Sequence, residues 1–245
     1  EVLIWENGVE KVIEGSFAIA TDGADSALRK AVAIPFEGFT YPERFLVAST
    51  PFPLEQKFDR LALVNYVSDP QEWLVLLRVP SLWRVLVPTD EAMSDAELLS
   101  DEVKDGIFDR LIGNGREVQT DHRTLYRVHQ RVAKSFTKDR VILIGDAAHL
   151  NNPLGGFGMN SGVHDAFDLF GEIEPVLKTG ASIDRVARFE RRRRTVTHAF
   201  TQAQTIQNME YIKVGNGAGH AKKRADLQAI SDDDTKRRAY LMRQS

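Results

Sequence analysis

The alternation of apolar and polar positions divides the chain into a mixed beginning, a strand-rich middle and a helical end. The first residues predict a strand hairpin turned by Asn7 and Gly8, a third strand at 17–20, and a short helix at 27–34 after a polar turn. Pro, Asp and Ser then separate several β-branched and aromatic runs. These runs predict four strands, at 45–50, 60–68, 72–80 and 82–89.

Further along the chain, the spacing of apolar residues becomes helical. Residues 94–112 predict a helix that Ser94 caps and that carries acidic residues in its first turn. Residues 124–132 predict another strand, and the β-branched run at 140–144 predicts a short buried one. A glycine-rich loop separates that last strand from the next helix.

The last third of the chain predicts helices. The helix after the glycine-rich loop is indicated by apolar residues at helical spacing, namely Val163, Ala166, Phe167 and Phe170. From Ile183 to Ala203 the same spacing predicts one long amphipathic helix. Residues 215–224 are expected to be mobile before a final helical stretch. The order of elements predicts an α/β fold with an inserted sheet-rich segment and C-terminal helices.

Composition excludes several classes of function but does not identify one. Hydrophobic residues make up 42% of the 245 positions and charged residues 27%, with a net charge of −3. This balance gives no general attraction to nucleic acid or to a membrane surface. The absence of cysteine excludes disulfides, thiolate metal sites and a cysteine nucleophile. No apolar run approaches the roughly 20 residues that span a bilayer, and no secretory leader is present, so a cytoplasmic location is expected.

The glycine-rich loop has the composition of a ligand-binding loop. Asp146 comes directly after a predicted strand, where ligands bind in open α/β sheets, and its carboxylate accepts hydrogen bonds only. Pro153 fixes a turn. Gly155, Gly156 and Gly158 let the backbone approach a flat ligand closely. The free amides of the following helix, expected at 159–162, favour an anionic group.

This segment resembles the flavin-dependent aromatic hydroxylases, the group A FAD monooxygenases of the p-hydroxybenzoate hydroxylase type. Their Gly-Asp motif is similar to GDAAH at 145–149, and their flavin loop is similar to PLGGFGMN at 153–160, followed by Gly162 and Asp165. The resemblance implies that Asp146 binds the ribityl hydroxyls of FAD and that the amides near 159–160 face the N1–C2=O2 edge of the flavin. It implies a set of cofactor-binding residues in this region: Gly145, Asp146, Pro153, Gly155, Gly156, Gly158, Met159 and Asn160.

A second motif, near the start of the chain, resembles the Asp-Gly motif of the same family. It comprises Asp22 and Gly23, with Ser26 and Arg29 following. The resemblance places this turn near the FAD pyrophosphate, which adds Asp22, Gly23 and Arg29 to the cofactor-binding residues. The alternative is a local Asx turn in which Ser26 caps a helix.

One part of the family pattern is absent from this sequence. The family begins with a strand, a G-x-G-x-x-G loop and a helix that hold the ADP half of FAD, and the sequence has no such unit. Because the chain also opens directly in a strand without methionine, an N-terminal part is expected to be missing. The resemblance implies an FAD-binding domain in two pieces, a substrate domain and a helical end, with the boundaries 1–34, 135–180, 35–134 and 181–245.

The resemblance implies an FAD- and NAD(P)H-dependent monooxygenase that hydroxylates a small phenol-like substrate through a C4a-hydroperoxyflavin. The alternatives are a non-catalytic remnant of the fold used for binding or assembly, and a related flavin epoxidase or halogenase. Nothing in the sequence suggests a metal site, and neither nucleic acid nor membrane is expected as a partner, while a homodimer stays open. Four residues are candidates for contacting the substrate: Tyr66, Arg78, Tyr126 and Pro153.

Two other features invite a functional interpretation. Arg188 and the arginines at 191–194 form a basic cluster on a predicted helix, and such a cluster favours a solvated face or an ion-pair site over nucleic-acid binding. His149 follows Asp146 closely, and we expect it to be structural, because the implied flavin contacts beside it come from the backbone.

Overall fold

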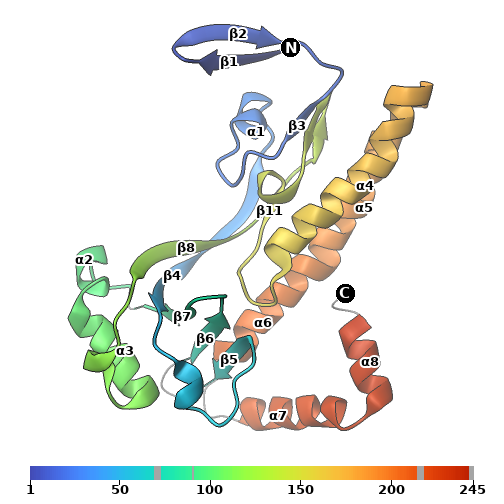
Figure 1. Cartoon of the computed structure of the whole chain (residues 1–245). Coiled ribbons are helices and arrows are strands. Elements are labelled where there is room, and N and C mark those ends of the chain that lie inside the picture. Colours follow the sequence, from blue (N-terminus) through green and yellow to red (C-terminus); the bar gives the residue numbers. More distant parts are fainter. Residues whose placement is uncertain (69–72, 90, 214–217, 243–245) are drawn as a thin grey trace. The chain divides into compact units, whose positions relative to one another are not determined.

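The computed structural model describes residues 1–68, 73–89, 91–213 and 218–242. The chain divides into two compact units (Figure 1). The first comprises Glu1–Pro42 and Arg127–Asn208, and the second comprises Glu43–Tyr126 and Met209–Ser245. Strands β4 (Phe36–Thr50) and β8 (His122–Ala133) pass from one unit into the other. The combination of sheets and helices confirms the predicted α/β fold class, while the predicted domain boundaries remain a prediction.

The first unit contains a small sheet in the order β3-β10-β9. Strand β3 (Ala18–Ala20) pairs in parallel with β10 (Val141–Leu143), so that Ala20 lies opposite Leu143. Strand β9 (Thr137–Lys138) pairs antiparallel on the other side of β10. Residues 17–20 and 140–144 were predicted as strands, and the parallel pairing of β3 with β10 brings the segments that follow them to the same edge of the sheet.

The predicted N-terminal hairpin is confirmed. Strands β1 (Val2–Glu6) and β2 (Val9–Ile13) pair antiparallel and form a sheet of their own. Asn7 and Gly8 turn the chain with φ angles of 53° and 77°. Positive φ at both central residues is the requirement of the two-residue turn that matches the twist of a hairpin, which is why Asn-Gly predicted it.

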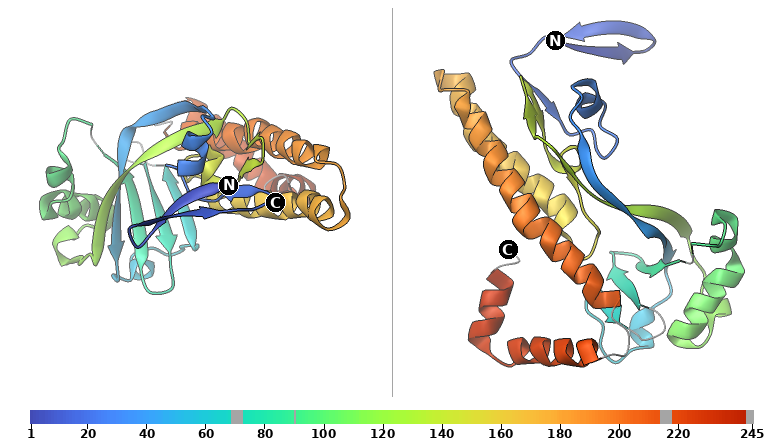
Figure 2. Two further views of the ribbon diagram at one scale, coloured as in Figure 1. Left: turned by 90° about the horizontal axis from the view of Figure 1, so that it is seen from above. Right: turned by 180° about the vertical axis from the view of Figure 1, so that it is seen from behind.

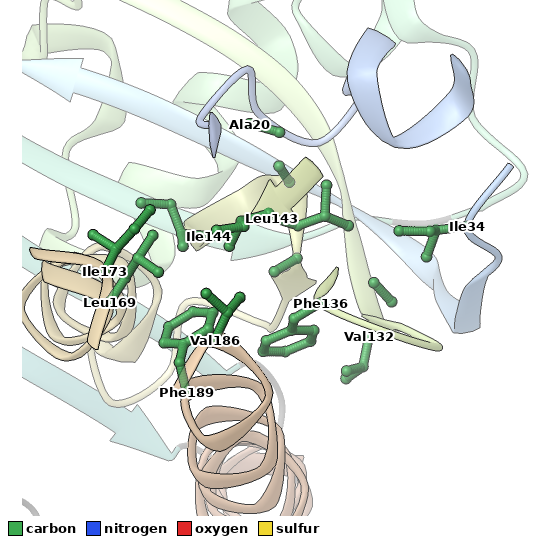
Figure 3. Close-up of a cluster of buried hydrophobic side chains, with 14 residues drawn as sticks. Ala20, Ile34, Val132, Phe136, Leu143, Ile144, Leu169, Ile173, Val186 and Phe189 are labelled. Carbon is green, nitrogen blue, oxygen red and sulfur yellow. The ribbon is translucent and has the colours of Figure 1, made fainter. Parts of the chain in front are cut away.

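Two long helices cover the small sheet of the first unit. Helices α4 (Phe157–Thr179) and α5 (Asp184–Val196) lie side by side in every view (Figure 2). Leu169 and Ile173 of α4, together with Val186 and Phe189 of α5, point into the buried cluster that surrounds Leu143 (Figure 3). After α5 the chain continues through a π-helical turn, η4 (Thr197–Gln202), into α6 (Ala203–Lys213), which replaces the single long helix predicted from Ile183.

Helix α4 forms where it was predicted, but a different face of it is packed. Val163, Phe167 and Phe170, whose spacing predicted the helix, are 49%, 77% and 59% exposed. The buried face instead carries Asp165 and Glu172 alongside its apolar residues. The basic cluster on α5 explains this, because Arg185, Arg188 and Arg192 form ion pairs with Glu172. The arginine cluster is therefore an ion-pair site between two helices.

Most of the second unit is antiparallel sheet and helix. The whole sheet has the order β11-β8-β4-β7-β6-β5, with β5 (Val64–Ser68), β6 (Trp73–Arg78) and β7 (Trp83–Pro88) in the predicted strand region. Strand β11 (His149–Leu150) is its other edge. One face of β4, β6 and β7 forms a core with α3 (Asp101–Ile112) through Leu46, Leu76 and Phe108. The β-branched and aromatic runs thus form the sheet that they predicted.

The remaining elements are short or lie near the C-terminus. They are α1 (Ala27–Ala31), η1 (Leu54–Gln56), η2 (Gly115–Glu117), η3 (Gly145–Ala147), α7 (Ala218–Ser231) and α8 (Asp234–Met242). Of residues 215–224, which were expected to be mobile, 215–217 lie outside the described residues. Residues 218–224 form the start of α7, so the final helical stretch begins earlier than predicted. None of the described helices has both the length and the apolar character needed to cross a membrane.

The helix predicted at 94–112 is two helices, because a second serine starts a new one. Ser94 caps α2 (Asp95–Leu98) in a capping box with Glu97, and Ser100 caps α3 by accepting from the Val103 amide. Each serine hydroxyl satisfies an amide that lacks an intrahelical partner, so a second cap interrupts what periodicity alone joins.

We expect Ser94→Ala to lower the free energy of unfolding by about 1 kcal/mol, because the substitution leaves the Glu97 amide without its side-chain acceptor. Urea unfolding followed by circular dichroism measures this loss. Ser94→Asp is the control, since aspartate also accepts at this position and acts favourably near a helix N-terminus. Equal losses in both variants would contradict the capping role.

Candidate functional site

Both motifs singled out in the sequence lie at the carboxyl ends of neighbouring parallel strands. Asp22 and Gly23 follow β3, and Gly145 and Asp146 follow β10. Because β3 and β10 pair in parallel, the two turns emerge at one edge of the sheet. This edge is where ligands bind in open α/β sheets. Two segments more than 100 residues apart in the sequence thereby form one candidate site.

Arg29 joins the two turns directly. Its Nη1 donates to the carbonyl of Ala147 at 2.9 Å, and its Nη2 donates to the carbonyl of Ala24 at 2.7 Å. The guanidinium lies 3.9 Å from the ring centroid of Phe36 and is buried, which lowers the pKa of Arg29. Arg29 was predicted among the cofactor-binding residues. The structure places its charge on protein carbonyls, where it holds the two turns together.

The Asp22 turn is built as a helix start. Asp22 Oδ2 accepts from the Leu28 amide at 3.1 Å, and Ser26 Oγ accepts from the Arg29 amide at 3.0 Å. Partial burial alone would raise the pKa of Asp22, but hydrogen bonds from Ser26 and the Leu28 amide hold it below its ordinary value. Gly23 has a φ of +80° with open space around it. The local turn considered in the sequence is therefore present, and it leaves Gly23 accessible.

The Gly145–Asp146 turn leaves its carboxylate available. Gly145 has a φ of +58°, and a Cβ on Gly162 would lie only 3.3 Å from the Gly145 Cα, so the start of α4 packs directly on this turn. Asp146 is exposed and has no hydrogen-bond partner among the described residues. An exposed, unpaired carboxylate that follows a β-strand is suited to accept hydrogen bonds from ligand hydroxyls.

A buried acid on α4 anchors this turn from beneath. Asp165 is 0% exposed, and its Oδ2 accepts from the Gly145 amide at 2.9 Å and from His149 Nε2 at 2.7 Å. Its Oδ1 accepts from Arg193 Nε at 2.6 Å. Burial alone would raise the pKa of Asp165, but these donors outweigh it and hold the pKa below its ordinary value. His149 is itself buried beside Phe136, as expected for a structural residue.

The loop at 151–156 rests on a second buried polar network. Gln130 Oε1 accepts from the Asn152 amide at 2.9 Å, and Asn152 Nδ2 donates to the Thr205 carbonyl at 2.8 Å. Asn152 Oδ1 accepts in turn from the Leu154 amide at 3.1 Å. Gln130, Asn152 and Thr205 are all buried. The conformation of the loop is thus fixed by side chains that the sequence analysis did not single out.

The glycines of the loop have different roles. Gly155 has a φ of +106°, and a Cβ there would lie 2.4 Å from the Phe157 ring. Gly156 and Gly158 instead face open space, where a ligand can approach the backbone. Gly156 ends the loop in a left-handed conformation, so α4 begins at Phe157 without a side-chain cap. The expected free amides at 159–162 are therefore corrected to 157–160, which still includes Met159 and Asn160.

The four candidate substrate residues are not brought into one group. Pro153 is exposed in the loop at 151–156, called the flavin-type loop below, where its carbonyl accepts from the Gly156 amide at 3.1 Å. On the sheet, Tyr66 lies opposite Val75 and Arg78 lies opposite Trp83. Val75 and Arg78 are three positions apart on one strand, so Tyr66 and Arg78 lie on opposite faces of the sheet. Arg78 packs over the Trp83 ring on the core side.

The face that carries Tyr66 has further aromatic residues. The Phe45 ring stacks on Tyr126 at a centroid distance of 6.4 Å and lies 5.5 Å from the Trp73 ring. Arg84 lies on the same face, because it is opposite Leu77, two positions from Val75. Partial burial raises the pKa of Tyr126, and the charge of Arg84 opposes this shift. Strand alternation in WRVLVP was a signal that could have singled out Arg84.

A family model described as an FAD binding domain matches residues 1–204, which is most of the chain. This chain belongs to the FAD-binding-domain family. The match confirms FAD as the cofactor and, with the relatives below, confirms the resemblance to flavin-dependent aromatic hydroxylases. The residues at the strand ends fit the group, because they combine an unpaired carboxylate, two glycines open to an approaching ligand and an uncapped helix N-terminus.

Named relatives of this family member include monooxygenases of phenols. The para-nitrophenol 4-monooxygenase of Pseudomonas sp. (strain WBC-3) is 35% identical over 228 residues, covering 91% of this chain and 56% of that protein. The pentachlorophenol 4-monooxygenase of Sphingobium chlorophenolicum is 27% identical, covering 87% of this chain and 40% of that protein. The chain therefore spans about half the length of the curated relatives it matches.

Solved structures agree with this placement in the family. The crystal structure of the p-nitrophenol 4-monooxygenase from Pseudomonas putida DLL-E4 superposes with a TM-score of 0.85 at 32% identity. That similarity covers 92% of this chain and 57% of the solved one. This FAD-binding-domain chain thus shares its fold with part of a solved p-nitrophenol 4-monooxygenase.

Proposed function

We propose that this chain functions in an FAD- and NAD(P)H-dependent monooxygenase that hydroxylates a small phenol-like ring. The observation that carries the proposal is the placing of both flavin-type turns at the carboxyl ends of β3 and β10, joined there by Arg29. A fold relic used only for assembly has no need for an exposed, unpaired carboxylate at a strand end, which is where Asp146 lies. Relatives named for nitrophenol and pentachlorophenol support the phenolic substrate class.

Bound FAD, once reduced by NAD(P)H, supplies the oxygen activation and transfer. Asp146 would accept hydrogen bonds from the ribityl hydroxyls and so hold the cofactor at the strand end. The free amides of 157–160 would stabilise the edge of the flavin ring system that is negative in the reduced state. A helix N-terminus stabilises such charge by about 0.3–1 kcal/mol, and by up to about 2 kcal/mol when partly buried.

The aromatic face of the second unit suits a phenolic ring. Trp73 and Tyr126 offer flat aromatic surface, on which aromatic rings pack favourably, and the buried Phe45 ring supports both from within the sheet. Arg84 adds a positive charge on the same face, which favours the more reactive phenolate form of a substrate. We propose Tyr66, Tyr126 and Arg84 as substrate contacts, and we retain Arg78 and the Pro153 carbonyl as candidates from the sequence.

The proposal predicts that Asp146→Ala weakens FAD binding by about tenfold or more, because hydrogen bonds to a charged acceptor are worth roughly 1.5–3 kcal/mol. Quenching of flavin fluorescence on titration with the purified chain measures the affinity. Asp59→Ala is the matched control, since it removes another exposed aspartate from the second unit.

Two results would contradict the proposal. If the unaltered chain shows no FAD binding, its function as a flavoprotein is wrong. If FAD binds but Asp146→Ala and Asp59→Ala behave alike, the role of Asp146 is wrong. The rate of NAD(P)H oxidation separates two further cases. A rate that rises when a nitrophenol or chlorophenol is added would support the hydroxylase, and a rate that the phenol leaves unchanged would indicate an oxidase.

A further inference from the structure

The buried acids of α4 differ in what they hold. Asp165 and Glu172 lie two turns apart on the packed face of the helix, and both pair with arginines of α5. Glu172 accepts only from arginine side chains among the described residues. Asp165 also accepts the backbone amide of Gly145, the residue that precedes Asp146. Of the two acids, Asp165 alone hydrogen-bonds to the turn at Gly145 and Asp146.

His149 and Arg193 leave Asp165 little freedom to turn. Nε2 of His149 and the Gly145 amide reach the same oxygen, Oδ2, while Arg193 holds Oδ1. An ionised carboxylate has no hydrogen to donate, so Nε2 of His149 carries the hydrogen of that bond. Both side chains of the His149–Asp165 pair are almost fully buried, at 1% and 0% exposure. Water therefore does not compete for these bonds.

We infer that His149 and Asp165 are positioning residues that orient the Gly145–Asp146 turn, and with it the Asp146 carboxylate, toward the flavin. Gly145 needs such an anchor, because a glycine at a φ of +58° has several other conformations available to it. The inference rests on the proposed function for the identity of the ligand. It adds that two buried side chains, His149 and Asp165, set the orientation of the exposed Asp146 carboxylate.

The test compares three variants of the full chain. His149→Phe keeps a flat buried ring beside Phe136 but removes the donor, whereas His149→Gln places an amide donor near the position of Nε2. Glu172→Gln is the matched control, because it weakens a buried ion pair on the same helix far from the turn. Each variant is measured for FAD affinity, for urea unfolding and for hydrogen exchange of the Gly145 amide.

We expect His149→Phe to weaken FAD binding about tenfold and to speed exchange of the Gly145 amide, and His149→Gln to restore most of both. Glu172→Gln is expected to lower stability while leaving FAD affinity and Gly145 exchange unchanged. The inference is overturned if His149→Phe leaves Gly145 exchange unchanged, or if FAD affinity follows stability alike in all three variants.

Failure of the inference is distinguishable from failure of the proposed function. If the unaltered chain binds no FAD, the proposed function is wrong, and the exchange of the Gly145 amide still decides whether His149 and Asp165 hold the turn. Faster exchange in His149→Phe with recovery in His149→Gln supports the anchoring, and unchanged exchange overturns it.

Discussion

Asp165→Ala is expected to lower the free energy of unfolding by about 3–5 kcal/mol, the usual loss when one partner of a buried ion pair is removed. The substitution leaves Arg193, His149 and the Gly145 amide without their shared acceptor. Urea unfolding at neutral pH measures the loss. Asp168→Ala is the control on the same helix, because its pair with Arg192 is partly exposed and is worth at most about 1 kcal/mol.

The same variant is expected to change the dependence of stability on pH. The native pKa of Asp165 lies below its ordinary value of 3.8, so the ionised carboxylate contributes its full stability above about pH 4. That contribution is lost as the pH falls through the native pKa. Asp165→Ala should therefore lose less stability than the unaltered chain on acidification below pH 4. Parallel pH profiles for the two proteins would contradict the ionised, hydrogen-bonded state of Asp165.

Gly38→Ala is expected to lower the free energy of unfolding by about 2–6 kcal/mol. A methyl group at this position would lie 2.0 Å from the Gln130 carbonyl oxygen, and the φ of +136° is unfavourable for any residue with a Cβ. The strained backbone costs about 1–3 kcal/mol and the overpacking about as much again. Because Gln130 also holds Asn152 at the flavin-type loop, FAD affinity should fall as well.

Gly171→Ala is the matched control for this substitution. Gly171 lies within α4, and a Cβ there meets no atom within 4 Å. Alanine in the interior of an exposed helix is favoured over glycine by about 0.5–1 kcal/mol, so this variant should be slightly more stable. A Gly38→Ala protein as stable as the unaltered chain would mean that β4 and β8 tolerate a side chain between them.

Local signals in the sequence predicted the elements well. Asn7-Gly8 predicted the hairpin, Ser94 predicted a cap, and the β-branched run before Gly145 predicted β10, because each depends on the conformations of a few adjacent residues. The order of strand, aspartate, glycines and helix also predicted the candidate site. The start of α4 was two residues out, because the left-handed Gly156 sets it and sequence alone does not reveal that conformation.

Long-range pairing could not be predicted in the same way. Nothing local indicates that Arg29 reaches the Ala147 carbonyl or that Asp165 accepts the Gly145 amide. Strand register decided that Tyr66 and Arg78 lie on opposite faces. The spacing of Val163, Phe167 and Phe170 predicted a helix correctly but not its packed face, because ion pairs with α5 turn the acidic residues inward.

Both hydrogen bonds that the Arg29 guanidinium donates to the two turns go to main-chain carbonyl oxygens. Its two partners are the carbonyls of Ala24 and Ala147, whose side chains take no part in the tie. The chemical identity of residues 24 and 147 can therefore vary without breaking it, within the space each has. Of the three residues, only Arg29 contributes its side chain to these bonds. A single missense change in the codon for residue 29 would therefore loosen the Asp22 turn and the Gly145–Asp146 turn together.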